Sequence, residues 1–388
     1  MILMPKGLLA LLLSFLTTVP VAAGPTSQPK PPPVKAAAVY VMDADSGDVL
    51  FASGADERRP PASMTKMMTL HLLAQAVREG RVKLSDPVPV SEEAYRTGGA
   101  QIWLEPGERL PLDQILRSIA IGSANDSCVA VAELLDGSTD AFVARMNEEA
   151  KALGMTHTHF ANPHGLDDPA HLTTAHDMAV LGRVLLKDDL VMKALAQRED
   201  RTIRNGRGGK LWLVNHNRLL WTFPGLIGLK TGYTQKAGYC LTGAARQQGM
   251  TMIAVVMGEP SSRDRFADVA ALLRWAFLTH DSHVLAKDGQ VMGEVSVRHG
   301  AAPSIRAVLD GDLRVTTAKG EKPSVKLTPH LPKSVTAPVK AGQKIGTLEV
   351  TGDGRSATYR LVAKDSVGRA TFGTMFLRLI RGALHVPA

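Results

Sequence analysis

The sequence predicts an α+β fold, and three features of the chain support this prediction. Strand patterns stand at both ends of the first 285 residues, and a mostly helical pattern fills the middle, from about residue 85 to about residue 200. After about residue 286, short runs of β-forming residues alternate with Gly, Pro and Asp turns. A chain of 388 residues has room for two or three domains at about 150 residues each. We therefore expect a mixed domain followed by a small all-β domain.

The mixed domain opens with a predicted β-hairpin, whose strands over residues 38–42 and 49–51 flank an Asp- and Gly-rich turn. Apolar residues at helical spacing predict a helix over 63–79, which Gly80 ends. The elements expected after it are loops at 87–89 and 162–165, strands at 238–246 and 252–258, and a helix at 262–279.

The predicted all-β domain contains five short strands, at 291–297, 304–309, 324–327, 344–350 and 356–364. A last segment, 372–386, is amphipathic when placed on a helix, with Arg378, Arg381 and His385 on one narrow face beside Thr374. The opposite face is apolar, which is the pattern of a helix lying on a membrane surface. The alternative interpretation is a terminal helix packed on its own domain.

The N-terminus has the pattern of a secretory signal peptide. Lys6 precedes an apolar stretch over 7–19, and Val21-Ala22-Ala23 offers small residues for cleavage. The stretch is shorter than the roughly 20 residues that span a bilayer, and an uncleaved anchor is the alternative. The predicted division of the chain is a signal peptide (1–23), a Pro-rich leader (24–35), the mixed domain (36–285), the β-rich domain (286–368) and the amphipathic segment (370–388).

Composition excludes several classes of protein. Hydrophobic residues make up 45% and charged residues 21% of the chain, which is typical of a globular protein and not of a disordered one. The formal net charge of +8 suits an anionic surface such as a membrane or cell wall, but the charges do not cluster with aromatics as in nucleic-acid-binding proteins. With only Cys128 and Cys240, the chain is not a disulfide scaffold, and both thiols are expected to be buried.

The first chemical motif is Ser63-Met64-Thr65-Lys66. Residues three apart lie on one face of a helix, so the lysine amine can reach the serine hydroxyl. A serine nucleophile needs a base, and lysine serves as one when burial or a nearby cation lowers its pKa. The pattern alone is weak, because about one match per chain of this length arises by chance, and Ser27-Gln28-Pro29-Lys30 also fits.

Two further motifs follow in the same domain. Ser123-Ala124-Asn125 offers a hydroxyl that can relay a proton and an amide that can hold a substrate carbonyl. Lys230-Thr231-Gly232 stands before a predicted strand, and its lysine adds positive charge that would favour the neutral form of Lys66. The order S-x-x-K, S-x-N, K-T-G is that of penicillin-binding proteins and class A β-lactamases.

These motifs make the chain resemble the low-molecular-mass D-alanyl-D-alanine carboxypeptidases, penicillin-binding proteins of the S11 serine peptidase family. The resemblance covers roughly residues 38–280, and the β-rich block and the tail fit the family's layout more loosely. It extends over the runs Pro60-Pro61-Ala62-Ser63-Met64-Thr65-Lys66, Ser123-Ala124-Asn125-Asp126, Asn162-Pro163-His164-Gly165-Leu166 and Gly228-Leu229-Lys230-Thr231-Gly232-Tyr233-Thr234.

The resemblance implies a β-lactamase/transpeptidase-like domain, with an antiparallel sheet, helices and a helical subdomain, followed by a small all-β domain and a membrane-surface helix. It implies removal of the terminal D-alanine from peptidoglycan stem peptides through an acyl-enzyme on Ser63, which penicillins would acylate. No cofactor, metal or nucleic acid is implied. The expected location is the periplasmic face of the cytoplasmic membrane, held peripherally by the C-terminal helix.

Carried over by motif, Ser63 is the nucleophile, Lys66 its base and Ser123 a proton-transfer group. The substrate-binding residues are Asn125, Lys230, Thr231 and Gly232, with Arg218 as a candidate partner for the terminal carboxylate. Backbone N–H groups of Ser63 and Tyr233 would form the oxyanion hole. Two departures from the family pattern are Tyr233, where close relatives often carry His, and Ala124, where they carry Gly; Tyr233 bears on substrate preference.

Other functions remain open at this level. A DD-endopeptidase or a β-lactamase can use the same scaffold, although residues 161–180 lack the Glu that deacylates class A β-lactamases. A non-catalytic wall-binding protein is a third hypothesis, which the three intact motifs disfavour. Five histidines lie between 157 and 176, but without metal-ligand spacing such as H-E-x-x-H, we expect no metal.

Overall fold

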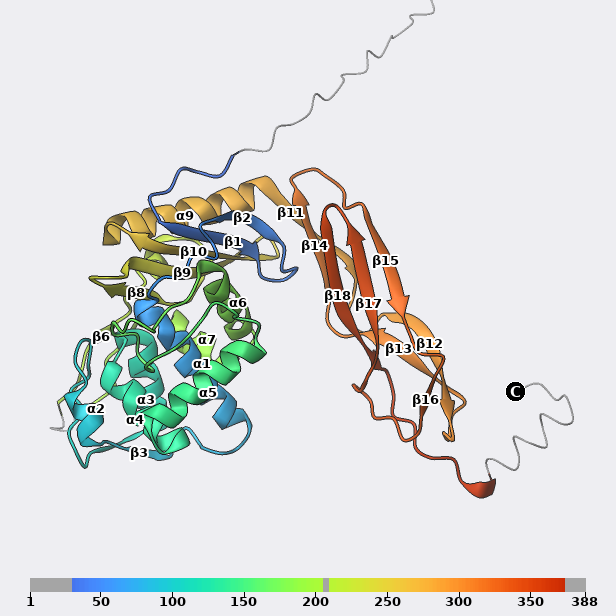
Figure 1. The fold of residues 1–388 in the computed structure, drawn as a ribbon, viewed down its shortest axis with the longest axis horizontal. Coiled ribbons are helices and arrows are strands. Elements are labelled where there is room, and N and C mark those ends of the chain that lie inside the picture. Colours follow the sequence, from blue (N-terminus) through green and yellow to red (C-terminus); the bar gives the residue numbers. More distant parts are fainter. Residues whose placement is uncertain (1–29, 205–208, 374–388) are drawn as a thin grey trace, which may run out of the picture. The chain divides into compact units, whose positions relative to one another are not determined.

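The structure is a computed structural model that describes residues 30–204 and 209–373 (Figure 1). Its strands in the first part of the chain are β1 (Ala38–Asp43), β2 (Val49–Ser53), β3 (Pro87–Pro89), β4 (Arg109–Pro111), β5 (Glu199–Asp200), β6 (Leu213–Val214), β7 (Leu226–Gly228), β8 (Thr231–Thr234), β9 (Gly238–Gln247) and β10 (Met250–Glu259). Its helices are the 3-10 helix η1 (Ala62–Thr65), α1 (Lys66–Arg78), α2 (Glu92–Arg96), α3 (Leu112–Arg117), the π-helix η2 (Ser118–Gly122), α4 (Asn125–Asp136), α5 (Thr139–Ala152), α6 (Ala175–Leu185), α7 (Asp189–Ala196), α8 (Leu219–Thr222) and α9 (Ser262–Thr279).

An antiparallel sheet organises the mixed domain. Its strand order is β2-β1-β10-β9-β7, with β8 also paired to β9, so the first strand of the chain lies beside one that follows about 200 residues later. Both faces of the sheet are covered, and the strands are therefore apolar on both sides. Val39, Val41 and Ala254 pack under α9, whereas Tyr40 and Val255 face the larger core that includes α1, α4 and α6 (Figure 1).

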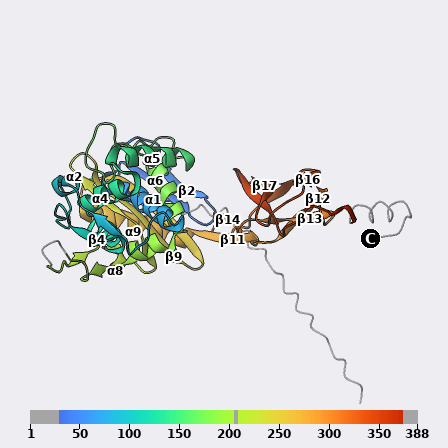
Figure 2. The same cartoon turned by 90° about the horizontal axis from the view of Figure 1, so that it is seen from below.

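The described residues from 280 to 363 form strands without helices: β11 (His280–Ala286), β12 (Val291–Arg298), β13 (Ser304–Leu309), β14 (Leu313–Ala318), β15 (Val325–His330), β16 (Ser334–Thr336), β17 (Lys344–Gly352) and β18 (Arg355–Ala363). Six of these strands form one sheet in the order β15-β17-β18-β13-β12-β16, and strands β12, β13, β16 and β17 lie together in both views (Figure 2). Leu309, Leu348 and Leu361 are buried in its core.

The predicted α+β fold is confirmed, and several expected elements appear at nearly their predicted bounds. The hairpin is β1–β2, the later strand pair is β9–β10, and α9 begins and ends at the predicted residues. Two details are wrong. Residues 87–89 are not a loop but the short strand β3, paired with β4, and Ser63 stands in a 3-10 turn before the α-helix begins.

The remaining expectations concern the ends of the chain and the domain boundary. The strand β11 begins at His280 and pairs with β14, so β structure is present before the boundary expected at 286. The signal peptide over 1–23 and almost all of the amphipathic helix over 372–386 lie outside the described residues. Within residues 30–204 and 209–373, no helix has both the length and the apolar character needed to cross a bilayer.

Candidate active site

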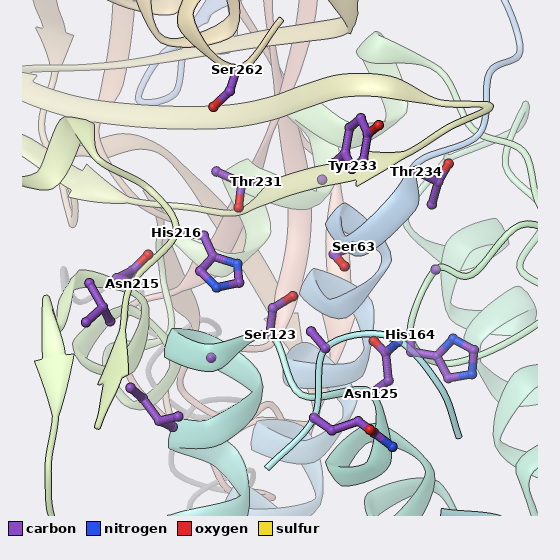
Figure 3. Close-up of a pocket in the computed structure, with 18 of the residues that line it drawn as sticks. Ser63, Ser123, Asn125, His164, Asn215, His216, Thr231, Tyr233, Thr234 and Ser262 are labelled. Atoms are coloured by element: carbon purple, nitrogen blue, oxygen red, sulfur yellow. The ribbon is translucent and has the colours of Figure 1, made fainter. Parts of the chain in front are cut away.

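A cleft of about 940 Å³ brings the three motifs together (Figure 3). Its lining includes seven residues singled out by sequence: Ser63, Ser123, Asn125, Arg218, Thr231, Gly232 and Tyr233. Ser63 comes from η1, Ser123 from the segment after η2, and Thr231 from β8, so three distant stretches supply hydroxyl groups to one space. The two lysines of the motifs, Lys66 and Lys230, are almost fully buried directly behind this lining.

Ser63 and Lys66 are hydrogen bonded. The Lys66 Nζ atom lies 2.9 Å from Ser63 Oγ and donates a second bond of 2.6 Å to the His164 carbonyl oxygen. Ser63 sits in the 3-10 turn, and Lys66 is the first residue of α1, so the i to i+3 spacing of the motif places the two groups side by side. The arrangement presents an amine and a hydroxyl at proton-transfer distance.

Burial controls the protonation of both lysines. Lys66 is completely inaccessible to solvent, and burial lowers its pKa to about 8, although Cys128 and Asp126 oppose this shift. Burial first, and then repulsion from Lys66, lowers the pKa of Lys230. Of the two causes expected from the sequence, burial and a nearby cation, burial is the principal cause of the lowered Lys66 pKa. A substantial fraction of Lys66 is therefore neutral near pH 8 and available as a base.

Two glycines allow backbones to approach the nucleophile. Gly165 has φ +95°, and a Cβ atom there would lie 1.9 Å from the Ala62 carbonyl oxygen. A Cβ atom on Gly232 would lie 2.8 Å from the Pro61 carbonyl oxygen. Only glycine fits these contacts, which press the turn containing Ser63 between the 162–166 loop and strand β8.

Ser123 occupies an unusual position at the end of η2. Its φ of +59° is left-handed, which is uncommon for a residue other than glycine. The residue is 2% exposed, and its Oγ atom has no hydrogen-bond partner among the described residues. A buried, unpaired hydroxyl is costly to stability and is found mainly at functional sites, so this one is available to a bound substrate.

Asn125 is held by hydrogen bonds to the segment before β4, which forms the wall of the cleft opposite β8. Its side-chain Nδ2 donates to the Gly98 carbonyl at 2.7 Å, and its backbone N–H donates to Ala100 at 2.7 Å. The neighbouring Asp126 is buried and accepts the N–H groups of Ile102 and Leu104, each at 3.1 Å. The S-x-N segment and the loop before β4 therefore form one rigid unit.

The third motif supplies the strand edge β8, which pairs with β9 and carries Thr231 and Tyr233 at the cleft. The Thr234 Oγ1 atom donates to Asp167 at 2.6 Å, which ties the strand to the loop that holds His164. Tyr233 stacks on Tyr239 with ring centroids 4.2 Å apart and stays 54% exposed. A tyrosine at this position therefore adds an aromatic surface to the cleft rather than filling it.

Arg218 and Arg265 both line the cleft, and Arg265 is hydrogen bonded to the K-T-G strand. The Arg265 Nη1 atom donates to the Gly232 carbonyl at 3.0 Å, and its Nε atom has no partner within the described part of the chain. The residue is 6% exposed, and burial lowers its pKa to about 10, so it stays charged at neutral pH. Sequence analysis missed this residue, although an arginine in the first turn of a helix opposes the macrodipole and is a recognisable signal.

His216 also lines the cleft and was not predicted (Figure 3). Burial, and then the charges of Lys230, Arg265 and Lys66, lower its pKa to about 4, so the imidazole is neutral at physiological pH. The only hint in the sequence is its place two residues before Arg218.

The histidines between 157 and 176 have structural partners. His171 Nδ1 accepts the N–H of Ala161 at 3.0 Å, and its Nε2 lies 2.7 Å from Thr65 Oγ1, which in turn donates to the Ala62 carbonyl. Within residues 30–204 and 209–373, no group of three or more His, Cys, Asp or Glu side chains is arranged to hold a metal ion. Both cysteines are buried free thiols, as predicted. Burial raises the pKa of Cys128 to about 12 and that of Cys240 to about 11.

Comparison with known proteins identifies the class of protein that has this fold and cleft. Residues 25–261 match the model of the S11 peptidase family, D-alanyl-D-alanine carboxypeptidase, and residues 281–369 match the model of the penicillin-binding protein 5 C-terminal domain. The chain belongs to the S11 D-alanyl-D-alanine carboxypeptidase family, which confirms the resemblance stated from its motifs.

Individual relatives extend over nearly the whole chain. It is 40% identical over 346 residues to D-alanyl-D-alanine carboxypeptidase DacF of Bacillus subtilis, which covers 89% of each chain. It is 33% identical over 369 residues to DacA of Escherichia coli, which covers 93% of this chain and 90% of that one. The crystal structure of penicillin-binding protein 5 from Haemophilus influenzae superposes with a TM-score of 0.72 at 31% identity and covers 88% of this chain and 99% of that one.

Proposed function

We propose that this chain removes the terminal D-alanine from peptidoglycan stem peptides by acyl transfer to Ser63. The observation that carries the proposal is the 2.9 Å contact between Ser63 Oγ and the buried Lys66 amine, whose pKa is lowered to about 8. A neutral amine at this distance takes the hydroxyl proton as Oγ attacks the carbonyl carbon of the scissile amide. The family and the named relatives support this activity more than that of an endopeptidase or a β-lactamase.

In the first step, a bond forms between Ser63 Oγ and the carbonyl carbon, while the carbonyl π electrons move to oxygen. The backbone N–H groups of Ser63 and Tyr233 stabilise that oxyanion. The tetrahedral intermediate then breaks its C–N bond, and the proton taken up by Lys66 returns through Ser123 to the leaving D-alanine amine. Ser123 fits this relay because its buried Oγ has no other partner among the described residues. Water then hydrolyses the ester and regenerates Ser63.

Substrate binding uses the cations around strand β8. Thr231 and the charges of Lys230 and Arg265 receive the terminal carboxylate, with Arg218 as a further cation at the rim. Asn125 holds the peptide from the opposite wall. Gly232 brings β8 against the turn at Pro61, which sets the distance between the carboxylate site and Ser63. Penicillins carry a carboxylate and a strained amide and would acylate Ser63 in the same cleft.

The test is D-alanine release from a pentapeptide ending in D-Ala-D-Ala, together with labelling by fluorescent penicillin. Ser63→Ala is expected to abolish both, and Lys66→Ala nearly so, because the two groups act as one proton-transfer unit whose losses do not add. Penicillin labelling of Ser63→Ala protein at the wild-type level would refute the assignment of the nucleophile. Labelling of the wild type without D-alanine release would indicate another peptide substrate.

We further propose that the chain is exported and held peripherally at the outer face of the cytoplasmic membrane. The signal-peptide pattern over 1–23 and the basic amphipathic pattern over 372–386 support this location. Deletion of residues 370–388 is expected to release active protein from the membrane fraction. Unchanged retention of a form cleaved after Ala23 would contradict the proposed anchor.

A further inference from the structure

Exposed apolar side chains concentrate in the cleft. Five of the thirteen large apolar residues that are exposed in the described part of the chain line this one cavity: Trp103, Leu166, Trp212, Val214 and Tyr233. Isolated exposed apolar residues are ordinary, but a group around one cavity indicates a binding surface. Trp103 is 64% exposed, although its neighbours Ile102 and Leu104 are buried.

The backbone holds Trp103 outward at a cost in strain. Its φ of +57° is left-handed, which is an outlier for a bulky side chain. The buried carboxylate of Asp126 accepts the N–H groups on either side of it, those of Ile102 and Leu104, at 3.1 Å each. These backbone hydrogen bonds to Asp126 hold the conformation without any contribution from the indole, and strain of this kind occurs at functional positions.

Among the described residues, the indole of Trp103 has no ring or cation partner, in contrast to the other exposed tryptophans. Arg201 lies 4.5 Å from the ring centroid of Trp212, whose Nε1 atom donates to Glu199 at 2.8 Å. Arg198 lies 5.9 Å from the ring of Trp221. Within residues 30–204 and 209–373, neither a ring nor a cation is placed against Trp103. Its π face is free for a ligand.

The charges near the cleft differ from one side to the other. Lys210, Arg218 and Arg265 line it, and none of the described lining residues is Asp or Glu. The segment 97–104 around Trp103 carries no charged residue, and Glu105 and Glu108 follow it. A stem peptide presents its carboxylate at one end and, where its third residue is a diamino acid, an alkyl chain with an ammonium group. In this cleft the carboxylate meets the cations, and an aromatic face that carries no cation is suited to receive the ammonium group.

We propose that Trp103 is a specificity-determining residue that binds the alkyl chain and ammonium group of the diamino acid at the third position of the stem peptide. The inference rests on the proposed acyl transfer at Ser63, because the peptide must enter with its terminal D-alanine at β8. Trp103 then distinguishes a stem with a free amine, which is not cross-linked, from one whose amine is acylated.

The experiment uses the full chain and two pentapeptides, L-Ala-γ-D-Glu-L-Lys-D-Ala-D-Ala and its Nε-acetyl twin, which keeps the alkyl chain and loses the charge. The readout is the ratio of kcat/KM for the two peptides, which does not depend on how much of each preparation is active. The wild type is expected to prefer the free amine by about fivefold, as one cation–π contact provides. Trp103→Leu is expected to bring the ratio to about one, and Trp103→Phe to an intermediate value.

Trp221→Leu is the matched control, because Trp221 is an exposed tryptophan that does not line the cleft, and its ratio should equal that of the wild type. A wild-type ratio near one, or a preference that survives in Trp103→Leu, overturns the inference and leaves the proposed function intact. Release of D-alanine from neither peptide by the wild type overturns the proposed function and this inference with it.

Discussion

Substitution of Gly165 by alanine tests how closely the 162–166 loop controls the nucleophile. The new Cβ atom would lie 1.9 Å from the Ala62 carbonyl oxygen, whereas ordinary van der Waals contact begins at 3.4 Å. Backbone must therefore move by about 1.5 Å, and the atom in the way belongs to the residue before Ser63. Because a misplacement of about 1 Å can cost about 100-fold in rate, we expect acylation by penicillin to slow by about 100-fold or more.

Gly154→Ala separates this clash from backbone strain. Gly154 also has a positive φ, +81°, but nothing lies within 4 Å of an added Cβ atom. The Gly154→Ala variant should lose about 1–2 kcal/mol of unfolding free energy, which is the usual cost of placing a residue other than glycine in a left-handed conformation. Its rate of acylation should equal that of the wild type. The assay is the second-order rate constant with fluorescent penicillin, beside thermal unfolding of both variants. Acylation of Gly165→Ala within threefold of the wild type would refute the reasoning.

Three further predictions concern the groups around Ser63. The pKa of Lys66 is lowered to about 8, and its neutral form is the base. The value of kcat/KM should therefore rise as the pH increases through about 8 and level off above it. A kcat/KM that does not change between pH 6 and 10 would contradict this. Ser123→Ala removes no hydrogen bond seen among the described residues, so the unfolding free energy should stay the same or rise while D-alanine release falls by about 100-fold or more. A loss of stability above about 0.5 kcal/mol would show that the hydroxyl is structural. Arg265→Gln should lower kcat/KM about 10- to 100-fold for a peptide with a free terminal carboxylate. Arg263→Gln, on the exposed side of the same turn, should leave kcat/KM unchanged. An equal loss of kcat/KM in the two variants would exclude a contact between Arg265 and the carboxylate.

The parts of the site that the sequence predicts are those encoded in short motifs. Ser63 and Lys66 are three residues apart, and one helical turn places them together whatever the rest of the fold does. The regular elements with strong apolar periodicity, such as α9, are likewise predictable from local pattern.

The parts that the sequence does not predict depend on contacts between distant residues. Arg265 reaches Gly232 only because α9 packs over the sheet that carries β8. The outward position of Trp103 depends on Asp126, which lies more than 20 residues later, in helix α4. The pKa of Lys66 is lowered mainly because the side chain is buried, and a short motif does not encode burial.

The order of strands in the main sheet determines when this domain can fold. The strand β1 pairs with β2 in a local hairpin, but its other neighbour is β10, and Ala38 is opposite Met257. Most of the mixed domain must therefore be synthesised before β1 meets this second neighbour. Non-local pairing of this kind slows folding, because a long loop must close before the contact is made. If the proposed export takes place before folding, this topology delays closure of the sheet until β10 has also crossed the membrane. The separation of β1 from β10 along the chain is therefore compatible with the proposed export.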